Sequence, residues 1–153
     1  MAAPVTPVVP EDHALRTLLE DARTIAVVGL SSKPGRPSLD VASYLQDHGY
    51  RIVPVNPRET EVLGEHAYAS LPEIPADPLV DIVDVFRRAE FTPEVARDAV
   101  AIDAGALWLQ EGIVNEEASG IASDAGLEVI MGVCIKRTSQ RLGLDASEEE
   151  EEP

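Results

Sequence analysis

Short apolar runs alternate along the chain with segments of helical periodicity, and this alternation leaves few folds open. The predicted strands are the apolar runs at residues 24–30, 51–55, 80–86, 106–109 and 127–131. The predicted helices cover residues 11–22, 38–48 and 114–125, together with a segment that has Thr92 as its N-cap and closes at Gly105. Strands without polar alternation, separated by helices, are typical of βαβ units with right-handed crossovers. The sequence therefore predicts a single Rossmann-like α/β domain, with a parallel five-stranded sheet and helices on both faces.

The two ends of the chain differ in composition from this alternating part. Residues 1–10 contain three prolines, and residues 148–152 are five consecutive glutamates. We expect a flexible Pro-rich N-terminus at 1–10, a folded domain at 11–140 and a disordered acidic tail at 141–153. Solubility is the simpler role for the tail, and docking to a partner is the alternative.

Charge and composition exclude several classes of protein. A formal net charge of -16 argues against attraction to nucleic acid phosphates. No apolar run reaches the roughly 18 residues that would span a bilayer, and the first residues do not resemble a secretory signal. The single cysteine, Cys134, excludes an internal disulfide. We expect a cytoplasmic protein without a membrane or nucleic acid partner, and its oligomeric state is open.

The candidate binding residues follow the predicted strands, because ligands of open parallel sheets bind outside the carboxyl ends of the strands. Five of the twelve basic residues lie in the first three of these loops. In an acidic chain, such clustering indicates an anion-binding cleft. The candidates are Gly29, Ser31, Ser32, Lys33, Arg36, Pro37 and Ser38 after the first strand, Asn56, Pro57 and Arg58 after the second, Phe86, Arg87 and Arg88 after the third, and Gln110 and Glu111 after the fourth.

The first of these loops has the character of a phosphate site. Free N–H groups and the positive end of a helix dipole meet where Pro37 and Ser38 begin the helix. Gly29 and Gly35 leave room for an anion, and the serines add donors. The alternative is that glycine, serine and proline satisfy only the backbone of a βα turn.

The loop lacks the dinucleotide fingerprint G-x-G-x-x-G, since Ser31 and Pro34 stand where glycines would be needed. The second strand ends before Arg58 rather than before the acid that would hold an NAD ribose. An arginine there suits a ribose phosphate, which coenzyme A carries on its 3′ position and NADP on its 2′ position. NAD is the least favoured of the three ligands.

Few other side chains suggest chemistry. Phe86 either covers an adenine face or simply ends a buried strand. Glu111 is an acid at a strand end that could bind a ligand amide or ribose. Trp108 and Cys134 are expected to pack in the core, and His13, His48 and His66 have no partner by spacing, so they are interpreted as surface residues. Paired carboxylates, metal-ligand spacing and a nucleophile with a base are not visible, which favours binding over catalysis.

Four motifs in this order resemble the small stand-alone CoA-binding domain proteins of bacteria. The motifs are residues 25–31 with 36–38, residues 50–57, residues 81–88 and residues 106–112. The resemblance covers about residues 15–137, and this family is similar to the nucleotide-binding domain of the succinyl-CoA synthetase α subunit.

The resemblance implies that residues 29–38 hold CoA phosphates and that Arg58 takes the place of a CoA-contacting lysine. It also implies that residues 85–87 and 109–111 flank the adenosine. The chain departs from the family at Gly132 and Val133, where a polar Asp-Arg pair is frequent, so no role is carried over to Cys134. The leading hypothesis is a CoA or acyl-CoA binding or regulatory module, with an NADP-dependent reductase or a subunit of an acyl-CoA synthetase as alternatives. A purely structural protein with an empty cleft is a third class.

Overall fold

The computed structural model describes residues 7–144 and contains one parallel sheet of five strands. The strands are β1 (Thr24–Val28), β2 (Arg51–Val55), β5 (Ile82–Val85), β6 (Ala106–Leu109) and β7 (Glu128–Met131). Their order across the sheet is β2-β1-β5-β6-β7, and every neighbouring pair is parallel. The prediction of a Rossmann-like α/β fold is confirmed.

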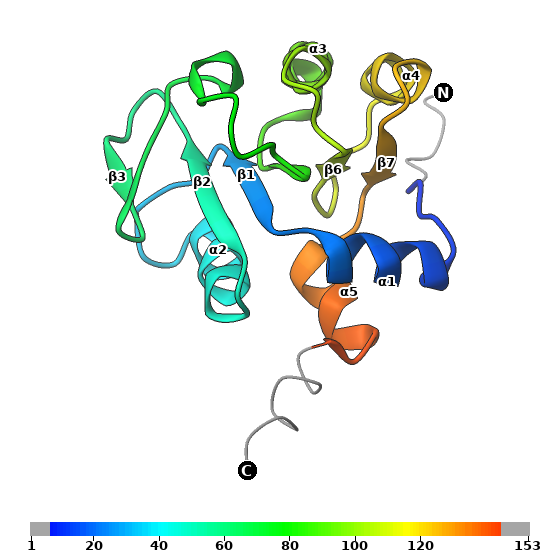
Figure 1. Cartoon of the computed structure of the whole chain (residues 1–153), viewed down its shortest axis with the longest axis horizontal. Helices are drawn as coiled ribbons and strands as arrows, with labels where there is room; N and C mark the ends of the chain where they lie inside the picture. The colour runs from blue at the N-terminus through cyan, green and yellow to red at the C-terminus, as the bar shows by residue number, and fades with distance from the viewer. Residues whose placement is uncertain (1–6, 145–153) are drawn as a thin grey trace.

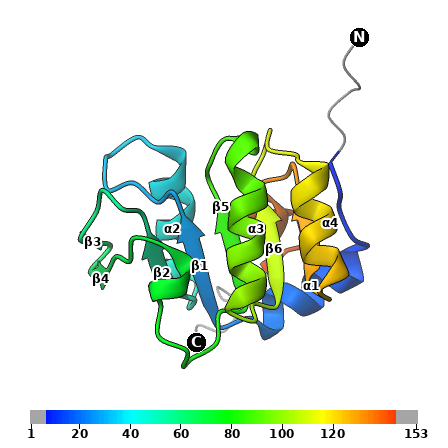
Figure 2. The ribbon, with the colours of Figure 1, turned by 90° about the horizontal axis from the view of Figure 1, so that it is seen from above.

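Helices cover both faces of the sheet (Figure 1). They are α1 (Asp12–Asp21), α2 (Pro37–Asp47), α3 (Thr92–Ala101), α4 (Glu116–Asp124) and α5 (Ile135–Arg141). Helices α1, α2 and α5 pack on one face and α3 and α4 on the other, and α3 and α4 lie side by side when seen from above (Figure 2). The burial of all five β1 residues reflects this double cover, which explains why the strand sequence shows no polar alternation.

Alternate residues of each strand enter the two cores. Ile25 and Val27 of β1 pack with α1 and α2, whereas Ala26 and Val28 face the opposite layer. Trp108 of β6 is fully buried, and its indole N–H donates to the carbonyl of Val133 at 2.9 Å. The prediction that Trp108 belongs to the core is confirmed.

Several short elements were not predicted. They are the two-stranded hairpin β3 (Glu61–Val62) and β4 (Glu65–His66), the 3-10 turns η1 (Leu71–Glu73) and η2 (Ala89–Phe91), and α5. These elements are too short to show a periodic apolar pattern, although α5 buries Ile135. Helix α5 ends at Arg141, and Leu142 directly after it is buried.

The described part of the N-terminal segment, residues 7–10, contacts the edge of the sheet. Val8 exchanges two backbone hydrogen bonds of 2.9 Å with Met131 and so forms a bridge on the open edge of β7. The rest of the expected flexible start, residues 1–6, and the expected acidic tail from residue 145 lie outside the described residues.

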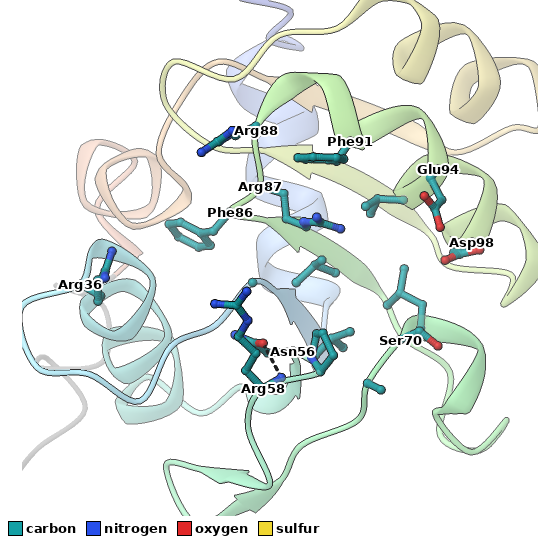
Figure 3. Close-up of a pocket in the computed structure, with 17 residues that line it drawn as sticks. Arg36, Asn56, Arg58, Ser70, Phe86, Arg87, Arg88, Phe91, Glu94 and Asp98 are labelled. Carbon is teal, nitrogen blue, oxygen red and sulfur yellow. Dashed lines mark hydrogen bonds between the residues drawn. The ribbon is translucent and has the colours of Figure 1, made fainter.

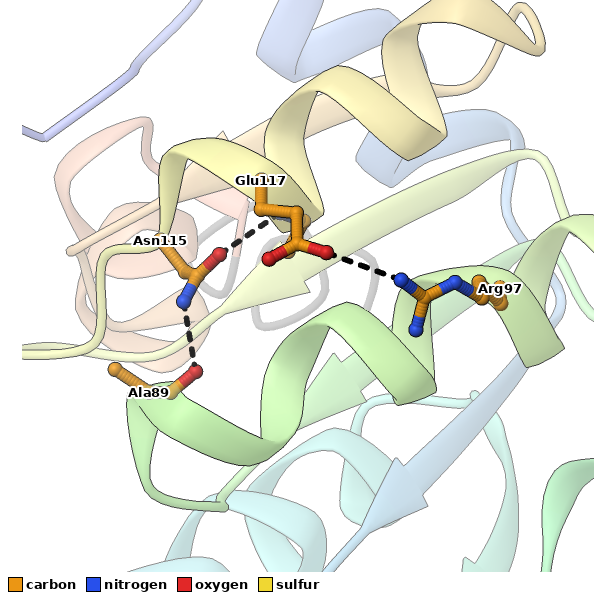
Figure 4. A network of polar contacts seen from close by, with 5 residues as sticks. Ala89, Arg97, Asn115 and Glu117 are labelled. Carbon is orange, nitrogen blue, oxygen red and sulfur yellow. Dashed lines mark hydrogen bonds and ion pairs between the residues drawn. The ribbon is translucent and has the colours of Figure 1, made fainter.

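Two polar contacts join the start of α4 to η2 and to α3 (Figure 4). Asn115 caps α4 by accepting from the Ala118 N–H at 2.8 Å, and its side-chain N–H donates to the carbonyl of Ala89 at 3.0 Å. Arg97 and Glu117 form an ion pair of 3.0 Å.

The predicted N-cap of α3 is wrong by one residue. Thr92 is the first helical residue rather than the N-cap, and its hydroxyl donates to the Ala89 carbonyl at 2.7 Å.

Candidate functional site

The carboxyl end of β1 is held between the ends of its two neighbours. The Gly29 N–H donates to the Val55 carbonyl at 2.8 Å, and the Val28 carbonyl accepts from the Phe86 N–H at 2.8 Å. A Cβ on Gly29 would lie 2.5 Å from the Phe86 carbonyl oxygen, and the residue has a φ of 87°. Only glycine accommodates both conditions. The chain reverses its direction across the sheet between β1 and β5, which is where open α/β sheets bind ligands.

Two clefts lie on either side of this junction. The first, of about 710 Å³, lies between the ends of β1, β2 and β5 and the first turns of α3 (Figure 3). The second, of about 1010 Å³, is bounded by the loops after β1, β5 and β6 and by α5. The two clefts share Gly29, Arg36, Phe86, Arg87 and Arg88. One elongated ligand could therefore occupy both.

Four arginines line the first cleft, and they come from three separate loops: Arg36, Arg58, Arg87 and Arg88. Figure 3 shows Arg36, Arg58 and Arg88 spread around one end of the cleft and Arg87 near its middle. Within residues 7–144, no ion pair joins Arg36, Arg58 or Arg88 to a carboxylate. Guanidinium groups without an internal carboxylate partner are available to an anionic ligand.

The opposite side of the first cleft carries residues that sequence analysis missed. Glu94 and Asp98 of α3 lie there together with Ser70 (Figure 3). Partial burial, and to a lesser degree the neighbouring Glu94, raise the pKa of Asp98. Phe91 also lines the cleft, and the guanidinium of Arg87 lies 4.5 Å from the centre of its ring. The first cleft therefore has a cationic side, an acidic side and an aromatic ring between them.

The turn after β2 is braced by Asn56. Its side-chain oxygen accepts from the Arg58 N–H at 2.9 Å, and its side-chain N–H donates to the Leu30 carbonyl at 3.0 Å. These bonds join the turn to the loop after β1 and place Arg58 in the lining of the first cleft, beside Pro57. Asn56 lines the cleft too, with its amide engaged on both sides.

The glycine-serine loop is largely hydrogen-bonded to its own surroundings. The Ser31 N–H donates to the hydroxyl of buried Ser38 at 3.1 Å, and the Lys33 N–H donates to the Ser31 hydroxyl at 3.1 Å. Ser31, Pro37 and Ser38 line the second cleft, whereas Ser32 and Lys33 line neither cleft. The structure thus brings most of the predicted loop residues together and leaves these two at its outer side.

The unexpected helix α5 forms one wall of the second cleft. It contributes Lys136 and Arg137, and Cys134 immediately precedes it. Arg137 pairs with Glu111 at 3.1 Å, and Lys136 pairs with Asp40 at 2.9 Å. Cys134 lies against the core, as expected, and is only half-buried.

Gln110 is almost completely buried, with 3% of its surface exposed, and both ends of its amide are used internally. Its N–H donates to the carboxyl of Asp84, and its oxygen accepts from the Ile135 N–H at 3.4 Å. Asp84 lies in the centre of the sheet, where burial raises its pKa to about 8. Gln110 therefore connects β5 to the start of α5 in the wall of the second cleft, which it lines.

Neither cleft is lined by a histidine, and residues 7–144 contain no group of three metal-ligating side chains. No helix in the same part of the chain combines the length and apolar character of a membrane span. The lining of the two clefts therefore offers cations that can bind an anion and side chains that can cover an aromatic ring. Among the described residues, this lining shows no acid–base pair beside an exposed nucleophile.

Comparison with known proteins agrees with this arrangement. The CoA binding domain family matches residues 23–140. The chain belongs to that family. Its relatives include the uncharacterized protein YneT of Bacillus subtilis (strain 168), which is 46% identical over 127 residues, 83% of this chain and 93% of YneT.

Two further relatives extend the comparison. The structure of a hypothetical protein from Pyrococcus horikoshii OT3 has a TM-score of 0.85 and 36% identity, covering 92% of this chain and 99% of that one. The alpha subunit of acetate–CoA ligase [ADP-forming] II of Pyrococcus furiosus is 30% identical over 136 residues. That match covers 82% of this chain and only 29% of the ligase subunit. The CoA-binding resemblance seen in the sequence is confirmed at the level of the family.

Proposed function

We propose that the protein binds coenzyme A or an acyl-CoA across the two clefts and acts as a binding or regulatory module. The observation that carries this proposal is the convergence of Arg36, Arg58 and Arg88 on the first cleft, none of them in an ion pair within residues 7–144. Three such cations in a chain of net charge -16 favour a ligand with several phosphates.

The chemistry of coenzyme A fits the order of groups along the clefts. Its 3′-phosphate and adenosine suit the first cleft, where Arg58 supplies a cation and apolar residues such as Val55 and Leu71 form the floor. Its pyrophosphate suits the junction near Arg36 and Arg88. The pantetheine arm then extends into the second cleft, toward Cys134.

A second candidate is a subunit of an acyl-CoA synthetase, which the 30% identity to the ligase alpha subunit favours. In this role the chain would supply the part of the subunit that the match covers, 29% of its length. An NADP-dependent reductase is a further alternative, since an arginine can also bind a 2′-phosphate. We infer a cytoplasmic location, which suits a free thiol such as Cys134.

A ligand panel tests the proposal. Purified protein is titrated by calorimetry and melted in the presence of CoA, acetyl-CoA, NADP, NAD and ATP. We expect the largest stabilisation from CoA or acetyl-CoA, about 2.7 kcal/mol at 100 times the Kd. Equal stabilisation by NAD, or none by CoA, would contradict the proposal, and a larger effect of NADP would favour the reductase.

A further inference from the structure

Glu59 holds donors of the loop in which the sequence predicts a phosphate site. Its carboxylate oxygen Oε2 accepts from the Ser32 N–H at 2.9 Å and from the Ser32 hydroxyl at 3.0 Å. These bonds lower the pKa of Glu59, which shows that the loop favours a negative charge at this point. A backbone N–H together with a hydroxyl is also a typical donor pair for a phosphate oxygen.

The position of Glu59 follows from the turn after β2. Asn56 ties this turn to the loop after β1, and the Glu59 N–H donates to the Asn56 carbonyl at 3.2 Å. Arg58 and Glu59 are adjacent, yet Arg58 lines the first cleft while Glu59 contacts Ser32. The same turn therefore supplies a cation to the cleft and an anion to its phosphate loop.

The contact between Glu59 and Ser32 opposes the binding of a ligand phosphate electrostatically, and it does so only at this point of the loop. A phosphate that approaches Ser32 meets two donors already in use and a carboxylate that repels it. Lys33 is next in sequence and weakly favours the charged form of Glu59. Because Glu59 is accessible to solvent, its carboxylate can leave Ser32 and become hydrated, so the contact is reversible.

We propose that Glu59 is an internal competitor at the phosphate loop, an affinity-determining residue whose carboxylate occupies Ser32 until a ligand phosphate displaces it. This inference rests on the proposed binding of CoA. Ser32 lines neither cleft but follows Ser31, which lines the second, so a pyrophosphate at the junction would extend one residue outward along the loop to take over the Ser32 donors. The contact holds the loop in one conformation in the free protein and lowers affinity for phosphorylated ligands.

The test compares Glu59→Ala with Glu61→Ala in the full chain. Glu61 is an exposed acid in β3, two residues away, and its replacement removes the same charge without freeing Ser32. We expect Glu59→Ala to lower the Kd for CoA about three- to fivefold, which corresponds to about one net hydrogen bond at a solvent-exposed site. Glu61→Ala is expected to change it less than twofold. Inorganic pyrophosphate serves as a second probe, and the melting temperature checks the fold of each variant.

The outcomes separate this inference from the proposed function. If the wild type binds CoA and Glu59→Ala binds it no better than Glu61→Ala, the competitor role is overturned and CoA binding stands. If Glu59→Ala weakens CoA, Glu59 braces the loop and the inference is again wrong. If no variant binds CoA, the proposed function fails, and a gain in pyrophosphate affinity specific to Glu59→Ala would still support the competitor.

Discussion

The side-chain amide of Gln110 donates a hydrogen bond to the carboxyl of Asp84, and both groups are buried in the middle of the molecule. The other carboxyl oxygen of Asp84 has no hydrogen-bond partner within the described residues. Burial without a cation raises the pKa of Asp84 to about 8, so this residue is protonated at neutral pH.

The first prediction concerns stability against pH. The pKa of Asp84 is about 8 in the folded chain and returns toward 3.8 on unfolding. Its contribution to the free energy of unfolding is therefore fully present below about pH 4 and is lost as pH rises to about 8. Urea unfolding at several pH values should show a decline in this window that Asp84→Asn flattens.

A matched control for this prediction is Glu128→Gln, which neutralises an exposed acid of β7. It should leave the slope of stability against pH close to that of the wild type. Equal slopes for Asp84→Asn and the wild type would show that Asp84 does not govern this dependence.

The second prediction concerns the junction of β1 and β5. Gly29→Ala adds a Cβ 2.5 Å from the Phe86 carbonyl oxygen at a φ of 87°. Gly35→Ala introduces the same left-handed strain at a φ of 88°, with no atom within 4 Å of the new Cβ. We expect Gly35→Ala to cost about 1–2 kcal/mol and Gly29→Ala clearly more. Similar melting temperatures for the two variants would contradict the close approach as the cause.

The sheet could be predicted because its central strands β1, β5 and β6 are buried on both faces. The run from Thr24 to Val28 needs no polar position, and Gly29 follows it directly. Parallel strands then bring their carboxyl ends to one edge, so the loops that contain Arg36, Arg58 and Arg87 could be expected to meet. Local sequence carried enough information for these features.

Other features of the site depend on tertiary contacts that local sequence does not reveal. Helix α5 has only seven residues, so its apolar pattern is too short to predict a helix. Because the helix was not predicted, the pairing of its Arg137 with Glu111 could not be predicted either. The contact between Ser32 and Glu59 joins residues 27 positions apart. One signal was available for the acidic side of the first cleft: Phe91, Glu94 and Asp98 have helical spacing directly after the two arginines.

The third prediction concerns Arg87 and the ring of Phe91. The guanidinium lies 4.5 Å from the ring centre, an arrangement that holds the cation at the cleft. Phe91→Leu keeps an apolar side chain and removes the aromatic face. Because a partly exposed cation–π contact contributes about 0.5–1 kcal/mol, the Kd for CoA should rise about two- to fivefold. The melting temperature should change little, since Phe91 is 38% exposed. An unchanged Kd would mean that the ring does not position Arg87.

The last prediction concerns Arg58 and the 3′-phosphate of CoA. Asn56 fixes the backbone of Arg58, and its guanidinium can bind a phosphate through two parallel hydrogen bonds. Arg58→Ala should weaken CoA binding by about 1.5–3 kcal/mol, the range for hydrogen bonds to charged groups. The same variant should bind dephospho-CoA as well as the wild type does, because that ligand lacks the phosphate.

The matched control for Arg58→Ala is Arg97→Ala, since Arg97 pairs with Glu117 outside the cleft and its loss removes the same charge. Calorimetric titration of the wild type and both variants with CoA and with dephospho-CoA measures these changes in Kd. Equal losses for CoA and dephospho-CoA would place Arg58 away from the 3′-phosphate, and the preference for CoA over NADP would then depend on Arg36 and Arg88.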